Sequence, residues 1–132
     1  MKMPKIKQSE IVSRTFTIHG EPCAKANSRI MIFRNGKPRC IKNKASQDYV
    51  DNFIKESKLL NIPEFVGDVI LHCTIFYKSY RKDLDESLIM DCLQKSGILR
   101  NDRQIKEKHI HHRISRESPC SVITLETKIS VY

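Results

Sequence analysis

The stretch from Arg81 to Arg103 reads R-K-D-L-D-E-S-L-I-M-D-C-L-Q-K-S-G-I-L-R-N-D-R and decides the fold. Its apolar residues recur at the spacing of one helix face, and Gly97 is a typical residue to follow a helix end. The pattern predicts a helix over residues 84–96. Asp83 and Asp85 stand at the start of this helix, and a third aspartate, Asp102, follows it.

The three aspartates invite two interpretations. Asp85 lies on the apolar side of the predicted helix, where a carboxylate is costly to bury unless something binds it. It can accept hydrogen bonds from amides of the first turn, as helix caps do, or it can bind a hard cation. The short connection after the helix returns the chain to the next strand, so we expect Asp102 to lie near Asp83 and Asp85. Such an all-oxygen cage suits Mg²⁺.

The charge of the chain favours a polyanionic partner. The 132 residues carry 24 Lys and Arg against 15 Asp and Glu, a net charge of +9, and this balance is typical of nucleic-acid binding. Residues 25–44 hold seven basic residues and no acidic one. An ordinary solvated surface is the alternative, but we expect DNA contacts from Lys25, Arg29, Arg34, Lys37, Arg39, Lys42, Arg81, Arg100 and Arg103.

Hydrophobic periodicity predicts a single mixed α/β domain. Residues 1–13 read as a flexible arm, and residues 14–132 as one domain with two main helices packed against one mixed sheet. Strands are expected over residues 14–19, 66–77, 105–114 and 122–129, and a hairpin is expected around Asn35-Gly36. The apolar strand 66–77 is expected to be central, the last two strands could pair as a hairpin, and residues 44–60 form the first helix.

The remaining signals exclude several classes of protein. Five scattered cysteines, with no C-x-x-C pair, argue against a zinc site and a disulfide framework, and they fit a reducing cytoplasm. No apolar run reaches the roughly 18 residues of a membrane span. His109, His111 and His112 lack a suitable fourth ligand nearby, so we expect them to face DNA or a subunit partner instead of zinc.

The motif K-D-L-D-E, a helix with D-C-L, and then S-G-I-L-R-N-D-R-Q-I resembles the RusA-type Holliday junction resolvases of bacteria and their phages. The segment from Phe16 to Pro22 and the basic run after it are similar to that family's opening, so the resemblance covers most of residues 14–127. It implies a RusA-like fold, a homodimer and a Mg²⁺-dependent endonuclease that resolves branched DNA by paired nicking. The implied metal ligands are Asp83, Asp85 and Asp102.

The chain departs from the family pattern at two positions. Glu86 stands where the family has Asn, and Ile89 stands where it has a lysine, in a helix about two residues shorter. We expect Lys82 to supply the missing catalytic charge, with Lys95, Arg100 and Arg103 as the remaining candidates. The alternative function is a catalytically inactive basic domain of the same fold that binds DNA or RNA.

Overall fold

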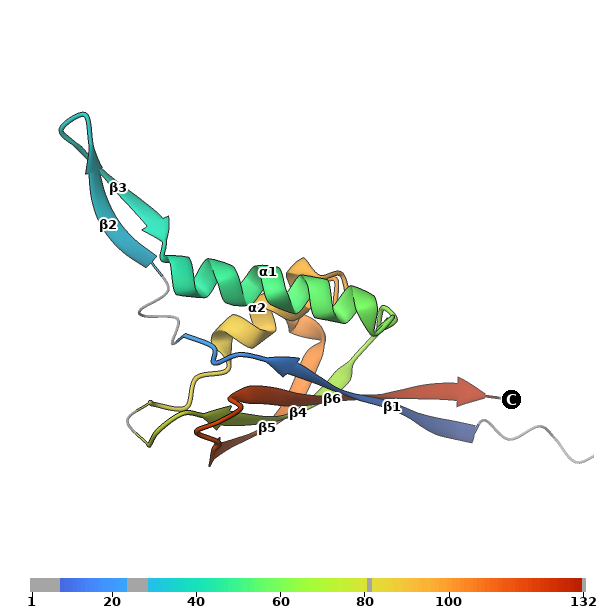
Figure 1. Cartoon of the computed structure of the whole chain (residues 1–132). Coiled ribbons are helices and arrows are strands. Elements are labelled where there is room, and N and C mark those ends of the chain that lie inside the picture. The colour runs from blue at the N-terminus through green and yellow to red at the C-terminus, as the bar shows by residue number, and fades with distance from the viewer. Residues whose placement is uncertain (1–7, 24–28, 81, 132) are drawn as a thin grey trace, which may run out of the picture.

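The computed structural model describes residues 8–23, 29–80 and 82–131 (Figure 1). In chain order its elements are β1 (Gln8–His19), β2 (Arg29–Arg34), β3 (Lys37–Lys42), α1 (Lys44–Leu59), β4 (Val69–Tyr77), α2 (Ser87–Lys95), the short 3-10 helix η2 (Asp102–Gln104), β5 (Ile105–Ile114) and β6 (Cys120–Val131). The predicted mixed α/β fold is confirmed. Within the described residues, no helix combines the length and apolarity that crossing a bilayer requires.

The main sheet has the strand order β1-β6-β4-β5, and the helices α1 and α2 cover one of its faces (Figure 1). Strand β4 pairs in parallel with β5 and antiparallel with β6, and β6 pairs antiparallel with β1. Helix α2 makes the crossover that two consecutive parallel strands require. As the sequence predicted, β4 is a central strand, while β5 lies at one edge.

The core forms where the alternating residues of β4 meet the two helices. Every second β4 side chain from Val69 to Tyr77 is buried, which follows from the two-residue period of a strand. Above them, Phe53 of α1 is fully buried and meets the ring of Phe16 edge-on, at 6.4 Å between ring centroids. The apolar side of α2 closes the core with Leu88, Ile89, Cys92 and Leu93.

Four asparagine and glycine positions set the ends of the helices and strands. The side chain of Asn43 accepts a 2.8 Å hydrogen bond from the Ser46 amide and caps α1. The turn between β2 and β3 holds Asn35 and Gly36 at φ 52° and 74°, the left-handed conformation of a type I′ hairpin, as predicted. Gly97 follows α2 at φ 83°, where a side chain would strain the backbone.

Two expectations about the strands were wrong. Strand β1 begins at Gln8, so residues 8–13 belong to the sheet, and residues 1–7 of the expected arm lie outside the described residues. Strand β6 does not pair with β5. The connection after β5 crosses the end of β4, where the Ser115 amide donates to the Tyr77 carbonyl. This places β6 on the other side of β4, where Ile123 and Leu125 are fully buried.

The packing of Phe53 predicts a large loss of stability on truncation. Phe53→Ala should lower the free energy of unfolding by about 3–5 kcal/mol, because it removes a buried ring and leaves a cavity beneath α1. Leu59→Ala, on a side chain that is 73% exposed in the same helix, is the control and should change it by less than about 0.5 kcal/mol. Urea unfolding followed by circular dichroism measures both. Equal effects would contradict this packing.

Candidate carboxylate site and nucleic-acid interface

Asp83 and Asp85 follow the carboxyl end of β4, directly before α2. A carboxylate oxygen of Asp85 accepts a 2.9 Å hydrogen bond from the Ser87 amide at the start of α2. The amide of Asp85 donates to the hydroxyl of Tyr77 at 3.2 Å. Burial raises the pKa of Tyr77, so this hydroxyl stays protonated at neutral pH. Asp85 therefore has the helix-start role that the sequence suggested, and its position is fixed from both sides.

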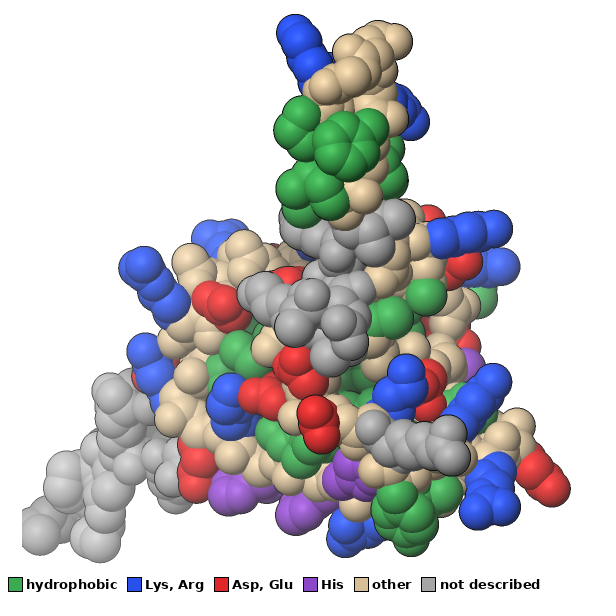
Figure 2. Space-filling view, turned by 90° about the vertical axis from the view of Figure 1, so that its left-hand side faces the viewer, with side chains coloured by type: hydrophobic (Ala, Val, Ile, Leu, Met, Phe, Trp, Pro, Cys, Tyr) green, Lys and Arg blue, Asp and Glu red, His purple; other side chains and the backbone are tan. Residues whose placement is uncertain are grey.

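Other carboxylates, each close to a lysine, lie at the same end of the sheet. One carboxylate oxygen of Glu21 accepts a 2.7 Å hydrogen bond from the backbone amide of Lys78. Its other oxygen lies 3.6 Å from the amine of Lys82. Glu86 lies 2.5 Å from the amine of Lys108, which reaches up from β5. Figure 2 shows acidic side chains gathered below the projecting hairpin, with basic ones around them. Sequence reasoning missed Glu21 and Lys108, because only the pairing of distant strands brings them here.

His112 supports the backbone of Lys82. Its Nε2 lies 3.0 Å from the Lys82 carbonyl, and because a carbonyl only accepts, this ring nitrogen donates. The ring stacks on Tyr77 at 4.8 Å between centroids and on Tyr80, which is 81% exposed, at 6.2 Å. The sequence left His112 without a role, and the stack gives it one: it holds the segment between β4 and Asp83.

The three histidines of β5 do not act as a group. Strand alternation and the register place His109 on the open face of the sheet, where its ring stacks on His72, and His112 on the helix side. In the part of the chain that the structure describes, no three His, Cys, Asp or Glu side chains are arranged to hold a metal ion. The rings of His109 and His112 therefore have separate packing roles, one on His72 and the other on Tyr77.

Asp102 does not lie near Asp83 and Asp85, and this sequence-based expectation was wrong for a single chain. Because β4 and β5 are parallel, the residues before β5 lie at the amino end of β4, next to Val69. Seven residues separate Ile105 from His112, so these positions are about 23 Å apart at the rise of a parallel strand. The ligands of one Mg²⁺ lie only about 2 Å from the ion, so the three aspartates of one chain cannot share it.

The segment that contains Asp102 has a clear structural role. The side-chain oxygen of Gln104 accepts hydrogen bonds from the backbone amides of Arg100 and Asn101. Its side-chain nitrogen donates hydrogen bonds to the backbone carbonyls of Phe65 and Gly67. The guanidinium of Arg100 contacts Glu64 at 2.8 Å. Arg100 and Arg103 therefore lie at the far end of the sheet, away from the phosphate position that we expected near Asp83.

The basic hairpin formed by β2 and β3 projects from the body (Figure 1), and we call it the arm. It leaves the same end of the sheet as Asp83, because β1 runs in the direction of β4 and ends at His19. Arg34, Lys37 and Arg39 are exposed on it, as expected for phosphate contacts. Arg29 and Lys42 lie at its base, and their side chains are outside the part of the chain that the structure describes. The candidates Lys25 and Arg81 lie outside the described residues.

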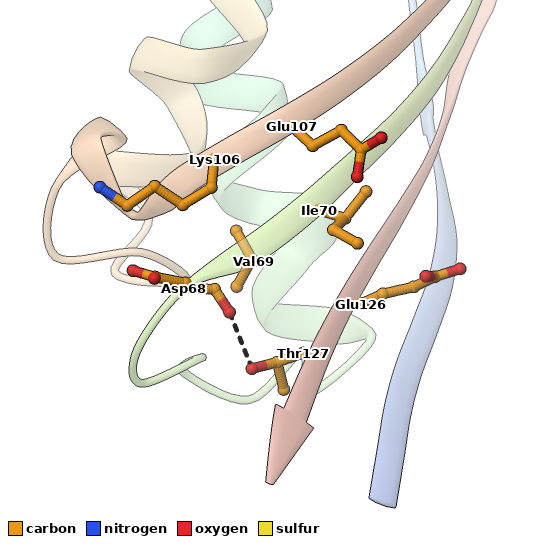
Figure 3. A pocket seen from close by; sticks show the side chains of 7 residues that line it. All are labelled: Asp68, Val69, Ile70, Lys106, Glu107, Glu126 and Thr127. Atoms are coloured by element: carbon orange, nitrogen blue, oxygen red, sulfur yellow. Dashed lines mark hydrogen bonds between the residues drawn. The ribbon is translucent and has the colours of Figure 1, made fainter. Parts of the chain in front are cut away.

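A hollow in the surface lies at the opposite end of the sheet from Asp83 (Figure 3). The hydroxyl of Thr127 donates to the Asp68 carbonyl there at 2.9 Å. Three carboxylate residues and one lysine line it, so its charge does not suit a polyanion. Its lining residues are Asp68, Val69, Ile70, Lys106, Glu107, Glu126 and Thr127. The hollow is therefore separate from the site formed by Asp83 and Asp85.

No model of a known protein family matches the chain, and no curated protein matches it significantly.

The contacts of Gln104 predict that it matters for stability. Gln104→Ala should lower the free energy of unfolding by about 2–3 kcal/mol, because two carbonyls and two amides lose their partner. Gln104→Glu should cost at least as much, since a carboxylate would face the Phe65 and Gly67 carbonyls. Gln47→Ala, which removes one exposed contact to Asp51, is the control. Chemical unfolding of all three variants measures this, and an unchanged midpoint for Gln104→Glu would refute the assigned contacts.

Proposed function

We propose that this protein is a metal-dependent endonuclease of the RusA type, which cuts branched DNA such as a four-way junction by phosphodiester hydrolysis. The observation that carries the proposal is the Asp83–Asp85 pair at the carboxyl end of the buried central strand, at the end of the sheet from which the basic arm projects. The motif resemblance supports the choice of reaction and of substrate.

The carboxylate pair fits a magnesium ion. Mg²⁺ commonly binds one or two carboxylates, keeps several waters and takes substrate phosphate oxygens as further ligands. In this proposal Asp83 and Asp85 would supply these two carboxylates, because the three aspartates of one chain lie too far apart to share one ion. When bound, the ion supplies an activated water and neutralises charge on the phosphate.

The residues of the chain itself bind and orient the substrate in this proposal. Arg34, Lys37 and Arg39 attract the phosphates, and because these side chains are exposed they contribute salt-dependent affinity. The bond to Ser87 and the contact with Tyr77 hold Asp85 in one orientation. A fixed carboxylate is an advantage in catalysis, since no reorganisation is needed at the moment of reaction.

Asp102 can contribute to such a site only from a second copy of the chain. A two-fold dimer can bring opposite ends of two identical subunits together, and a homodimer is what the resemblance implies. In the proposed enzyme, Asp102 of the partner subunit completes the site formed by Asp83 and Asp85. A dimer also presents two equivalent sites, which suits paired nicking of a junction.

The shared site predicts complementation between subunits. Asp83→Asn and Asp102→Asn should each abolish cleavage of a synthetic four-way junction in Mg²⁺, while binding in EDTA stays intact. Heterodimers of the two variants contain one intact site, so refolding an equimolar mixture should restore a single nick per junction. Product strands are resolved on a denaturing gel. Full activity of Asp102→Asn alone would remove Asp102 from the site, and no recovery in the mixture would refute the sharing of the site.

We propose Lys82 as the cation near Asp83 and Asp85. Its backbone is held by His112, and its amine lies beside Glu21 at the correct end of the sheet. Lys95 ends α2 and, with Arg100 and Arg103, lies toward the opposite end of the same chain. In the proposed dimer these three side chains would reach the site only from the partner subunit. The amine of Lys108 also reaches Glu86 near this site, although the backbone of Lys108 lies opposite Leu71, nearer the other end of β4. The sequence did not indicate this lysine.

Lys82→Ala should lower the single-turnover cleavage rate by a factor of about 10²–10⁴, with little change in junction affinity, because a positioned catalytic charge is lost. Lys108→Ala is the matched control, since it removes a nearby lysine that already contacts Glu86, and its cleavage rate should fall by less than about tenfold. A Lys82→Ala variant that binds weakly but cleaves normally at saturation would make Lys82 an ordinary phosphate contact.

A DNA-binding domain without cleavage activity is the second candidate function. The specific observation in its favour is Ile89, which is fully buried where the resemblance places a lysine. The two functions differ in one measurement. Incubation of the wild-type protein with a four-way junction gives nicked strands in Mg²⁺ but not in EDTA if the enzyme is active, and gives binding without products in both conditions if it is not.

A further inference from the structure

The arm has two chemically different faces. Directly opposed residues of a two-stranded ribbon share a face, so Arg34 with Lys37, and Ile32 with Arg39, define one side. On the other side Met31 lies opposite Cys40, and Phe33 lies opposite Pro38. These four residues carry no charge, whereas Arg29 and Lys42, which pair at the base of the arm, belong to the same side by the register. It is also unusually open to solvent, since Phe33 is 74% and Met31 61% exposed.

The rest of the described chain does not cover this apolar face. The arm projects from the body beyond the start of α1 (Figure 1), and within the described residues neither β2 nor β3 packs substantially against another helix or strand. Figure 2 shows hydrophobic side chains along the projecting hairpin. An isolated two-stranded hairpin is marginally stable in water, and exposed apolar patches commonly mark binding surfaces. A partner is therefore expected to contact this face.

The basic charge of the arm indicates what kind of partner binds it. No acidic residue occurs between Glu21 and Asp48, a segment that includes the entire arm. A second copy of this chain has a net charge of +9 and would repel the arm, whereas nucleic acid attracts it. Proteins that bind the minor groove combine Arg and Lys with apolar wedges, commonly Phe, Met or Pro, which enter between bases and partly unstack them. The two faces of the arm contain this combination.

We propose that the arm is a DNA wedge, in which Phe33, supported by Met31 and Pro38, enters between stacked bases while Arg34, Lys37 and Arg39 hold the flanking phosphates. Strands of six residues reach about 20 Å, enough to span a groove. The bases at a branch point are cheaper to unstack than those within a duplex, so the wedge favours branched DNA. This inference rests on the DNA binding of the proposed function but does not require cleavage.

The test uses the full-length protein in EDTA, so that binding is measured without cleavage. The probe is a synthetic four-way junction with 2-aminopurine at the branch point, whose fluorescence rises when the base is unstacked. Wild-type protein should raise the fluorescence. Phe33→Ala should abolish this rise and weaken binding by on the order of tenfold or more, the effect of removing one aromatic contact with a base.

Two control variants separate the wedge from the phosphate contacts. Phe33→Ala removes no charge, so the dependence of affinity on salt should keep its slope. The combined replacement of Arg34, Lys37 and Arg39 by Ala should reduce that slope by about three, roughly 0.9 for each lost phosphate contact. Leu59→Ala, at an equally exposed leucine outside the arm, should change neither fluorescence nor affinity.

Each other outcome overturns a defined part of the proposal. If the wild type binds the junction but does not change the fluorescence, or if Phe33→Ala behaves as the wild type, the arm is not a wedge and the proposed function stands. If Phe33→Ala instead changes the oligomeric state in analytical ultracentrifugation, the apolar face contacts a second copy. If the wild type does not bind DNA, both the wedge and the proposed function are refuted.

Discussion

The parallel pairing of β4 with β5 determines where the three candidate aspartates lie. Parallel neighbours need a crossover, and α2 supplies it by starting at the carboxyl end of β4 and ending near the amino end of β5. The residues just before α2 and the residues just before β5 therefore lie at opposite ends of the sheet, separated by the length of the strands. Asp83 and Asp85 belong to the first group and Asp102 to the second, so one chain cannot bring them together.

Much of the fold could be predicted because its signals are local. The apolar period marks α1 and α2, the alternation of β4 predicts its burial, and Asn35-Gly36 fixes a hairpin turn. The direction of a strand and the identity of its neighbours are not local. The pairing of β6 with β4 and the distance of Asp102 from Asp85 both depend on that direction, and periodicity does not encode it. For the same reason, Glu21 and Lys108 could not be recognised in advance.

The charges are distributed unequally between the arm and the end of β4. At the end of β4, Glu21 lies near Lys82 and Glu86 near Lys108. Exposed pairs of this kind contribute little to stability, so their main effect is to orient side chains. On the arm, Arg34, Lys37 and Arg39 form no ion pair with a described residue. The arm therefore retains the net attraction for a polyanion, while the body provides fixed carboxylates.

The burial of Ile89 shows how the core limits the chemistry of this site. Position 89 lies on the side of α2 that packs against the sheet, and Ile89 is fully buried there. A lysine at this position would lose its hydration, and its pKa would fall because desolvation disfavours the charged form. A cation that must stay charged beside carboxylates has to come from a more exposed position. Lys82 precedes the helix and its side chain is 58% exposed, so the proposed cation lies outside the core.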